Sequence, residues 1–367
     1  MARPHWNNCI MHDDEAVDGF IRDYFGAAYR KCLFVGGAGF DPRARKVAEQ
    51  LGAVMQDRLS GILIREERSD AVETLRDRAD ENEAAMRRLT DTFKALSVRI
   101  FDPADNAPVG GQRIVEALRL LDLPGDATDI VLDMSALSTG IAFPIARYLL
   151  ALCEARDDLN FHLMISSNPE LDARILGEPY ATPSMVRGFS GPGRQGRLPV
   201  ARVWLPQLAA GRMPTLQKII AAQDSPYRIC PILPFPSRNP RRADDLLSEF
   251  RELLDEGTVD ARDFLYVSER NPLDTYRKLS MLKRRYDQTM DQIYQPELLL
   301  SPLGSKVMAV GAMMAAIEHD LPVQHVENVR YDYDPTRSST EEEPADVTVH
   351  IWLHGPIYAG YAAPDRV

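Results

Sequence analysis

The segment Ser301–Lys306, SPLGSK, combines residue types that bind a phosphate group. It follows the apolar run ELLL and precedes an apolar helix pattern rich in small residues. Gly304 lets backbone amides approach a ligand, and the hydroxyl of Ser305 lies at the start of the helix, where unpaired N–H groups attract anions. Lys306 opposes the helix dipole, and a bound anion would relieve that conflict. We predict four ligand-binding residues here: Ser301, Gly304, Ser305 and Lys306.

A second glycine-rich turn lies at Phe34–Arg43, FVGGAGFDPR, directly after an apolar strand pattern. Three glycines permit positive φ and a close approach of amides to a ligand: Gly36, Gly37 and Gly39. Asp41 followed by proline is typical of a helix start without any ligand. Arg43, and Arg241 in a similar segment, are predicted ligand residues. The spacing fits neither GxGxxG nor the GK[ST] of a P-loop, so we expect neither NAD nor ATP and predict no cofactor.

A third cluster of polar residues follows the predicted strand Asp129–Met134, in the sequence DMSALSTG. Open α/β sheets bind ligands beyond the carboxyl ends of their strands, where Ser135, Ser138 and Thr139 lie. Asp133 is a candidate acid, base or ribose acceptor; alternatively, it organises the loop by accepting hydrogen bonds from neighbouring amides. Likewise, Ser138 or Thr139 has an alternative role as the cap of the next helix. There is no GxSxG motif, which argues against a serine hydrolase.

Strand and helix patterns alternate along most of the chain, which is typical of a parallel sheet covered on both faces. A length of 367 residues is long for one core. We predict an α/β fold with two Rossmann-like lobes and mainly parallel sheets. The predicted boundaries are an N-terminal extension at 1–28, a first lobe at 29–206 with a Gly/Pro-rich loop at 168–200, and a second lobe at 207–367. That loop has a basic character and is a lid, a crossover or a plain surface segment; its arginines include Arg187, Arg194 and Arg197.

Two pairs of segments are similar to each other and suggest an internal duplication. Tyr29–Arg43 aligns with Tyr227–Arg241 without a gap, and the segment from Leu132 aligns with the segment from Leu299. Repeats of this kind indicate related structural units. A duplication would place a ligand site between two similar lobes.

The pattern of strand, turn, [ST]-x-x-G-[ST]-K and small-residue helix, followed by the strand pattern LPVQHVENVRYD, resembles CARF (CRISPR-associated Rossmann fold) domains. The resemblance covers residues 298–332. CARF domains are Rossmann-like sensors of cyclic oligonucleotides, and two such halves in one chain would be similar to the SAVED sensors of anti-phage signalling. The resemblance implies that Gly304, Ser305 and Lys306 contact ligand phosphate or ribose. No nuclease, TIR or protease effector domain is visible, so a sensor of this kind would need a separate effector protein.

Composition narrows the classes of function. The formal net charge of −11 disfavours binding along a long nucleic acid, although a local group of amides and arginines still suits a small anion. The four cysteines are far apart in the sequence and are expected as buried thiols in a reducing cytoplasm: Cys9, Cys32, Cys153 and Cys230. We expect no membrane span and no secretion signal. His350 and His354 are about 13 Å apart along a strand, so we predict no metal site, and we expect His162 to be a satisfied core residue.

Two functions stay open from the sequence. The first is a ligand-binding regulatory protein that recognises a nucleotide or a cyclic oligonucleotide second messenger. The second is a two-lobe transferase or hydrolase that acts on a nucleotide-linked substrate, with Asp133 as the acid or base. The expected partner is an anionic small molecule or oligonucleotide, and assembly into a homo-oligomer stays open.

Overall fold

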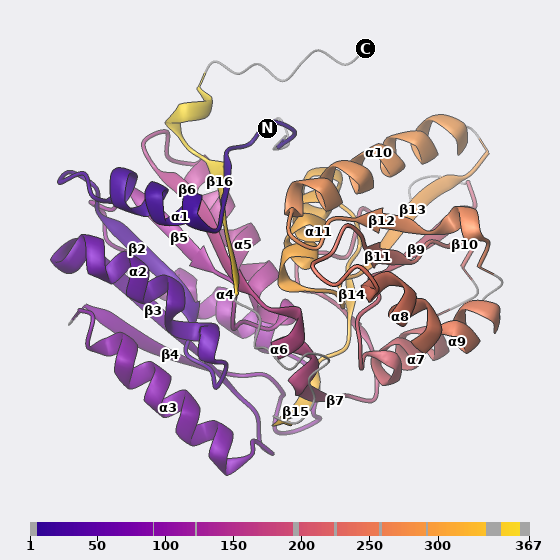
Figure 1. The fold of residues 1–367 in the computed structure, drawn as a ribbon, viewed down its shortest axis with the longest axis horizontal. Coiled ribbons are helices and arrows are strands. Elements are labelled where there is room, and N and C mark those ends of the chain that lie inside the picture. Colours follow the sequence, from indigo (N-terminus) through magenta and orange to yellow (C-terminus); the bar gives the residue numbers. More distant parts are fainter. Residues whose placement is uncertain are drawn as a thin grey trace. The chain divides into compact units, whose positions relative to one another are not determined.

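A computed structural model describes residues 6–90, 92–121, 123–193, 198–223, 226–256, 259–290, 293–334 and 346–359. The chain divides into two compact units, both visible in Figure 1. The seven-strand unit comprises Asn8–Asn168, Arg330–Asp332 and Glu343–Val367. The three-strand unit comprises Met1–Asn7, Pro169–Val329 and Tyr333–Glu342.

The seven-strand unit contains one sheet with the strand order β1-β16-β6-β5-β2-β3-β4. Its strands are β1 (Met11–Asp13), β2 (Cys32–Gly37), β3 (Leu59–Glu67), β4 (Phe93–Arg99), β5 (Asp129–Asp133), β6 (Asn160–Ser167) and β16 (Val347–His354). Strands β2 to β6 are parallel, whereas β16 and β1 add to the β6 edge in antiparallel orientation. Every residue of β2, β5 and β6 is buried, as expected for parallel strands covered on both faces.

Helices cover both faces of this sheet (Figure 1). They are α1 (Glu15–Phe20), η1 (Ile21–Phe25), η2 (Pro42–Arg45), α2 (Lys46–Met55), η3 (Gln56–Arg58), α3 (Glu73–Arg87), α4 (Gly110–Leu120) and α5 (Thr139–Glu154), and a short turn, η5 (Pro356–Tyr358), follows β16. One core cluster joins α1, η1, α2 and α3 to the sheet, with Phe34, Leu51 and Met55 fully buried. Helix α5 packs against α4, and its residues on the sheet side are apolar. The seven-strand unit is therefore a three-layer structure, with one sheet between two layers of helices.

The three-strand unit is built around the parallel strands β9 (Val200–Pro206), β10 (Arg228–Ile229) and β13 (Gln295–Ser301). The parallel strands β11 (Ile232–Pro234) and β12 (Leu265–Val267) pair with each other, and Ile232 of β11 bridges to Gln207, just after β9. Strand β8 (Ser184–Met185) pairs with β14 (Gln324–His325). Its helices are α6 (Pro169–Arg174), α7 (Met213–Ala221), α8 (Arg242–Glu249), α9 (Arg251–Glu256), η4 (Ala261–Asp263), α10 (Pro272–Met290) and α11 (Lys306–His319). Strand β7 is Ile175–Pro179, and β15 is Asn328–Tyr333.

The predicted α/β class with mainly parallel sheets is confirmed. The two units also share a strand order. In each, the first parallel strand lies between the next strand along the chain and a later one: β2 lies between β3 and β5, and β9 lies between β10 and β13. The segments from Leu132 and Leu299 contain the ends of β5 and β13 and the helices that follow, so they occupy comparable positions beside the first strand.

The other predicted correspondence does not match these positions. Tyr29–Arg43 contains β2, the first strand of its sheet, whereas Tyr227–Arg241 contains β10 and β11, which hold the second position. Their similarity reflects a shared strand–turn–helix pattern at different places. Internal duplication stays a hypothesis, since a common strand order alone does not establish it.

The predicted domain boundaries differ from those of the two units. Residues 8–28 are not an extension, because β1 pairs with β16 and α1 packs in the core. Strand β9, placed by the sequence at the end of the first lobe, pairs with β10 and β13 of the three-strand unit. Strand β16 returns to the seven-strand sheet. The predicted loop 168–200 contains α6, β7 and β8, and Phe189 within it is buried; Arg194 and Arg197 lie outside the described residues.

Candidate functional site

The candidate site lies at the carboxyl edge of the seven-strand sheet, beside β2 and β5. These strands are neighbours, and the chain continues from β2 to β3 on one side and from β5 to β6 on the other. The loops after β2 and β5 therefore separate at a topological switch point, which is where open α/β sheets bind ligands. Eight predicted residues lie at the ends of these two strands, in the loops or at the helix starts that follow: Gly36, Gly37, Gly39, Arg43, Asp133, Ser135, Ser138 and Thr139.

The glycines at the end of β2 allow this strand to pack closely against the loop after β5. A Cβ atom at Gly36 would lie 2.5 Å from Cζ of Phe34, and one at Gly37 would lie 3.1 Å from the carbonyl oxygen of Ala136. None of the three glycines has a positive φ, so this conformational freedom of glycine is not used here. The first two glycines are explained by contact with protein atoms. Gly39 has open space, since its nearest contact, Ala136 O, is 3.8 Å away.

Asp133 is the last residue of β5 and is 1% exposed. Its Oδ1 accepts hydrogen bonds from the backbone N–H of Ser135 at 2.9 Å and from the Ser135 hydroxyl at 2.5 Å. Its Oδ2 accepts no hydrogen bond from any described residue. Burial raises the pKa of Asp133 to about 7, against the lowering effect of the two Ser135 hydrogen bonds. One oxygen therefore organises the loop, and the other can donate or accept a proton near neutral pH.

Asp41 and Arg43 form a buried ion pair at the start of η2. Arg43, which is 2% exposed, donates from Nε to Asp41 Oδ1 at 2.9 Å and from Nη2 to Oδ2 at 2.6 Å. Asp41 also caps the turn by accepting from the Arg43 N–H at 2.9 Å, with Pro42 following it as predicted. Asn82 of α3 donates to the carbonyl oxygens of Gly39 and Asp41. The charge of Arg43 is thus largely balanced by Asp41, although both charges influence the nearby Asp133.

The loop after β5 leads to the amino end of α5. The Ser135 hydroxyl accepts from the Ser166 N–H at 2.7 Å, which fixes this loop on β6. Ser138 is the N-cap residue of α5, but its hydroxyl makes no capping hydrogen bond and is a buried oxygen without a partner in the described chain. Its N–H donates to Glu66 Oε1 at 2.7 Å, and Thr139 begins the helix. The Glu66 carboxylate already lies at this positive helix end, so the Ser138 hydroxyl is the group left to bind a polar ligand atom.

Sequence reasoning missed several charged residues at this edge. Glu66, at the end of β3, binds the Ser138 N–H and accepts from Arg68 at 2.9 Å. Lys46 Nζ lies 3.3 Å from Oδ2 of Asp346, which precedes β16. The charged run REER after the apolar run GILI was an available signal for Glu66. No local pattern could indicate the contact between Lys46 and Asp346, which are 300 residues apart.

The other predicted site residues belong to the three-strand unit. Ser301 is fully buried, and its hydroxyl accepts from Nε1 of Trp204 at 2.9 Å, which explains this residue by core packing. The Gly304 N–H donates to Gln207 Oε1 at 3.2 Å, and Ser305 caps α11 by accepting from the Met308 N–H at 3.3 Å. The turn therefore has the predicted helix-start geometry, with protein atoms as its partners. Lys306 is the first residue of α11, and Arg241 is exposed at the N-cap of α8.

Other sequence expectations concern chemistry elsewhere in the chain. All four cysteines are buried and none of them forms a disulfide bond, as expected for buried thiols. His162 is fully buried and hydrogen-bonded, as predicted. Among the described residues there is no cluster of three or more histidine, cysteine or acidic side chains suited to a metal ion. None of the described helices combines the length and apolar character needed to cross a membrane.

Comparison with known proteins adds little to this geometry. No protein-family model matches the chain, and no curated protein matches it. A universal stress protein from Pseudomonas aeruginosa is among the solved structures that match. It is 12% identical, with 84% of this chain and 96% of that chain covered and a TM-score of 0.22. At this TM-score the likeness carries no argument about the site.

Proposed function

We propose that this chain is a ligand-binding regulatory protein that recognises a nucleotide or a cyclic oligonucleotide second messenger. The ligand would bind at the carboxyl edge of the seven-strand sheet, where the loops after β2 and β5 separate. The observation that carries this proposal is the combination of a switch point with the buried Oδ2 of Asp133, which has no partner among the described residues. A ligand would supply the missing hydrogen bond, since an unpaired buried polar atom costs free energy.

The pairing of charges favours a ligand of low charge density. The basic side chains Arg43, Arg68 and Lys46 each lie within 3.3 Å of a carboxylate. A triphosphate would have to compete with those carboxylates, whereas a cyclic oligonucleotide carries one negative charge per phosphodiester. The Ser138 hydroxyl would donate a hydrogen bond to one such group, beside the Glu66 carboxylate at the amino end of α5. A nucleoside hydroxyl could accept a hydrogen bond from protonated Asp133.

The resemblance to CARF and SAVED sensors adds a biological setting to this proposal. In that setting, ligand binding would regulate a separate effector protein in anti-phage defence. Binding would act by stabilising one arrangement of the protein over another. By that resemblance alone, the turn Ser301–Lys306 of the three-strand unit would contact phosphate or ribose.

Asp133 also favours an alternative function, catalysis on a nucleotide-linked substrate. A carboxyl group with a pKa of about 7 and one unpaired oxygen is suited to general acid–base catalysis near neutral pH. Under this alternative, Asp133 would transfer the proton and the helix end would hold the phosphate. The two functions differ in whether the ligand stays intact.

A thermal-melting panel of nucleotides and cyclic oligonucleotides, with product analysis, tests both functions. A ligand at 100 times its Kd should stabilise the protein by about 2.7 kcal/mol, and a sensor should return it unchanged. Turnover that is lost in Asp133→Asn, with binding retained, would support the enzyme instead. If no compound in the panel raises the melting temperature, both proposals are wrong.

A serine pair provides a matched control for the location. Ser138→Ala removes the unpaired hydroxyl and should weaken binding by about 3- to 10-fold, the value of one hydrogen bond. Ser60→Ala changes a serine at the amino end of β3, where the hydroxyl bonds to the Cys32 carbonyl, and should leave binding unchanged. Equal affinities for both variants would argue against ligand binding at the start of α5.

A further inference from the structure

Three histidines form a continuous series of hydrogen bonds in the seven-strand unit, away from the candidate site. His12 Nδ1 lies 3.0 Å from His350 Nδ1, and His350 Nε2 lies 2.9 Å from His162 Nδ1. His162 Nε2 lies 3.1 Å from Oδ1 of Asp129, the first residue of β5. The series crosses three neighbouring strands, β1, β16 and β6, and ends on the fourth. It runs from half-buried His12 to fully buried Asp129.

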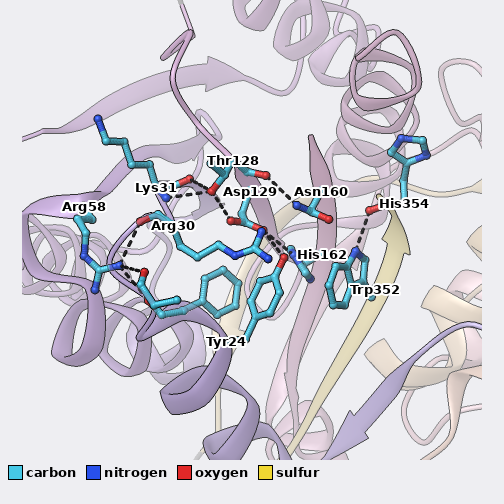
Figure 2. A network of polar contacts seen from close by, with 12 residues as sticks. Tyr24, Arg30, Lys31, Arg58, Thr128, Asp129, Asn160, His162, Trp352 and His354 are labelled. Carbon is cyan, nitrogen blue, oxygen red and sulfur yellow. Dashed lines mark hydrogen bonds and ion pairs between the residues drawn. The ribbon is translucent and has the colours of Figure 1, made fainter. Parts of the chain in front are cut away.

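Asp129 is held as a carboxylate by its surroundings (Figure 2). Its Oδ1 also accepts from Tyr24 OH at 2.9 Å and lies 3.4 Å from Arg30 Nη1, and its Oδ2 accepts from the Thr128 hydroxyl at 2.5 Å. Burial opposes the charge, but the hydrogen bond from His162 and the other contacts outweigh it and hold the pKa of Asp129 below its usual value. Asp129 can therefore only accept hydrogen bonds.

This carboxylate fixes the tautomers of all three neutral rings. His162 must donate from Nε2 to Asp129, which leaves its Nδ1 as an acceptor. His350 must then donate from Nε2 to His162, and His12 must donate from Nδ1 to His350. The one imidazole nitrogen outside the series is Nε2 of His12, and it carries a lone pair. A neutral imidazole has one donor and one acceptor, so no other assignment satisfies all three contacts.

The rings are enclosed by aromatic side chains and few charged groups. Phe20 stacks on His12 and His350 with centroids 4.6 and 4.1 Å away, and Trp352 lies 4.8 Å from His162. Burial lowers the pKa of each histidine, most strongly that of His350. The titratable or charged groups that face the series are Asp13 from β1, Tyr24 from η1, Arg30 before β2, Cys32 from β2 and Cys153 from α5.

We propose that His12, His350 and His162 form a proton relay that takes up a single shared proton and responds to pH at Arg30. A solvent proton bonds to His12 Nε2. The Nδ1–H proton of His12 then transfers to His350 Nδ1, and the Nε2–H proton of His350 transfers to His162 Nδ1. His162 becomes an imidazolium beside Asp129, and the other two rings return to neutral in the opposite tautomer. The number of protons is conserved in these transfers, and the positive charge has moved from His12 to His162 across two hydrogen bonds.

The number of protons that the three rings can take up follows from the pattern of hydrogen bonds between them. After one proton is taken up, every contact in the series is still a donor–acceptor pair, with its direction reversed between His12 and His162. A second proton would place two N–H groups face to face and break one contact. The series therefore accepts one proton readily and resists a second, so the three rings share one macroscopic titration.

Arg30 senses this proton because it shares Oδ1 of Asp129 with His162. An imidazolium at His162 repels the guanidinium and competes for the same oxygen. Arg30 lies just before β2, the strand that leads to the candidate site. Proton uptake should therefore weaken the contact between the Arg30 guanidinium and Asp129. Arg58 should not respond, because its guanidinium donates to the backbone carbonyl oxygens of Phe25, Ala27 and Arg30 (Figure 2).

Nitrogen-15 NMR of the full chain from pH 8 to pH 5 tests the relay. At pH 8, His12 should be the Nδ1–H tautomer, and His162 and His350 should be Nε2–H tautomers. On acidification, the signals of all three should change with one common midpoint, accompanied by Arg30 and not by Arg58. Three separate midpoints, or a different tautomer at His12, would overturn the proposal.

His350→Phe interrupts the relay while keeping an aromatic ring against Phe20. His12 should then titrate alone with a midpoint shifted by at least half a pH unit, and Arg30 should lose its response. His354→Gln, at the end of the same strand, should leave the common midpoint unchanged. An unchanged His12 midpoint in a folded His350→Phe variant would contradict the relay. If that variant does not fold, the wild-type tautomers still decide the question.

Discussion

Replacing Asp133 with asparagine should stabilise the protein increasingly as the pH rises. The folded-state pKa of this carboxyl group is about 7, whereas the usual value is 3.8. Between these values, the folded protein keeps a proton that the unfolded chain releases, so stability falls as the pH increases. The wild-type protein therefore loses about 4 kcal/mol between pH 4 and pH 8 through this residue. Asparagine cannot ionise and escapes that loss.

The asparagine variant carries a constant cost of its own. Its amide oxygen can still accept from Ser135, but its N–H groups occupy the position of Oδ2, where no described residue makes a hydrogen bond. An unpaired buried amide costs about 1–3 kcal/mol at every pH. We therefore expect the variant to be less stable than wild type at pH 4 and more stable at pH 8. The change in this difference, about 4 kcal/mol, is the quantity to measure.

Urea denaturation of both proteins at pH 4, 6 and 8 provides the assay, with Asp129→Asn as a matched control at the other end of β5. The pKa of Asp129 is lowered, so its stabilising effect is present above pH 3.8 and is lost as the pH falls. The control should therefore be less stable than wild type at pH 4, 6 and 8, whereas the stability difference of Asp133→Asn changes sign over this range. A stability difference for Asp133→Asn that does not vary with pH would refute the assignment of a raised pKa to this residue.

Two further predictions concern the three-strand unit. Ser305→Ala should lower the unfolding free energy by about 1 kcal/mol, because it removes the cap of α11. An unchanged unfolding free energy in urea denaturation would contradict this. Gly311→Ala should lower the unfolding free energy by at least about 1–3 kcal/mol, because the added Cβ would lie 2.2 Å from the Pro272 carbonyl oxygen. The control Gly125→Ala adds a Cβ that meets no atom within 4 Å, so it should change the unfolding free energy by about 0.5 kcal/mol or less. A tolerated Gly311→Ala would show that α10 and α11 can separate at no cost.

The sequence predicted the type of fold because each element carries its own periodic signal. The apolar runs at β2, β5 and β13 and the small-residue pattern of α11 indicated a parallel α/β architecture directly. Strand order depends on contacts between distant segments, so local sequence similarity did not predict which strands hold equivalent positions. Tyr29–Arg43 and Tyr227–Arg241 have similar sequences, but their strands occupy different positions in the sheets. The same limitation explains the boundaries, since the pairing of β16 with β6 joins residues nearly 200 positions apart.

The candidate site was predictable where residues follow a strand directly. Asp133, Ser135 and Ser138 lie at the switch point, as expected from their place after β5. The sequence could not decide between the two roles of Asp133, and the structure assigns one oxygen to the loop and leaves the other unpaired. The structural role of Ser301 could not be seen in the local sequence, because its hydroxyl accepts from Trp204, which lies almost 100 residues away. Its predicted position in a turn after a strand therefore suggested a ligand contact instead. The contact between His12 and His350 was hidden for the same reason.

Hydrogen–deuterium exchange with and without a nucleotide or cyclic oligonucleotide locates the binding site on the seven-strand sheet. We expect slower exchange in the segments 37–45 and 134–141, which contain the loops after β2 and β5 and the first turn of α5. Exchange around Asp129, at the opposite end of the sheet, should not change. A ligand that binds without protecting either segment would contradict the proposed location.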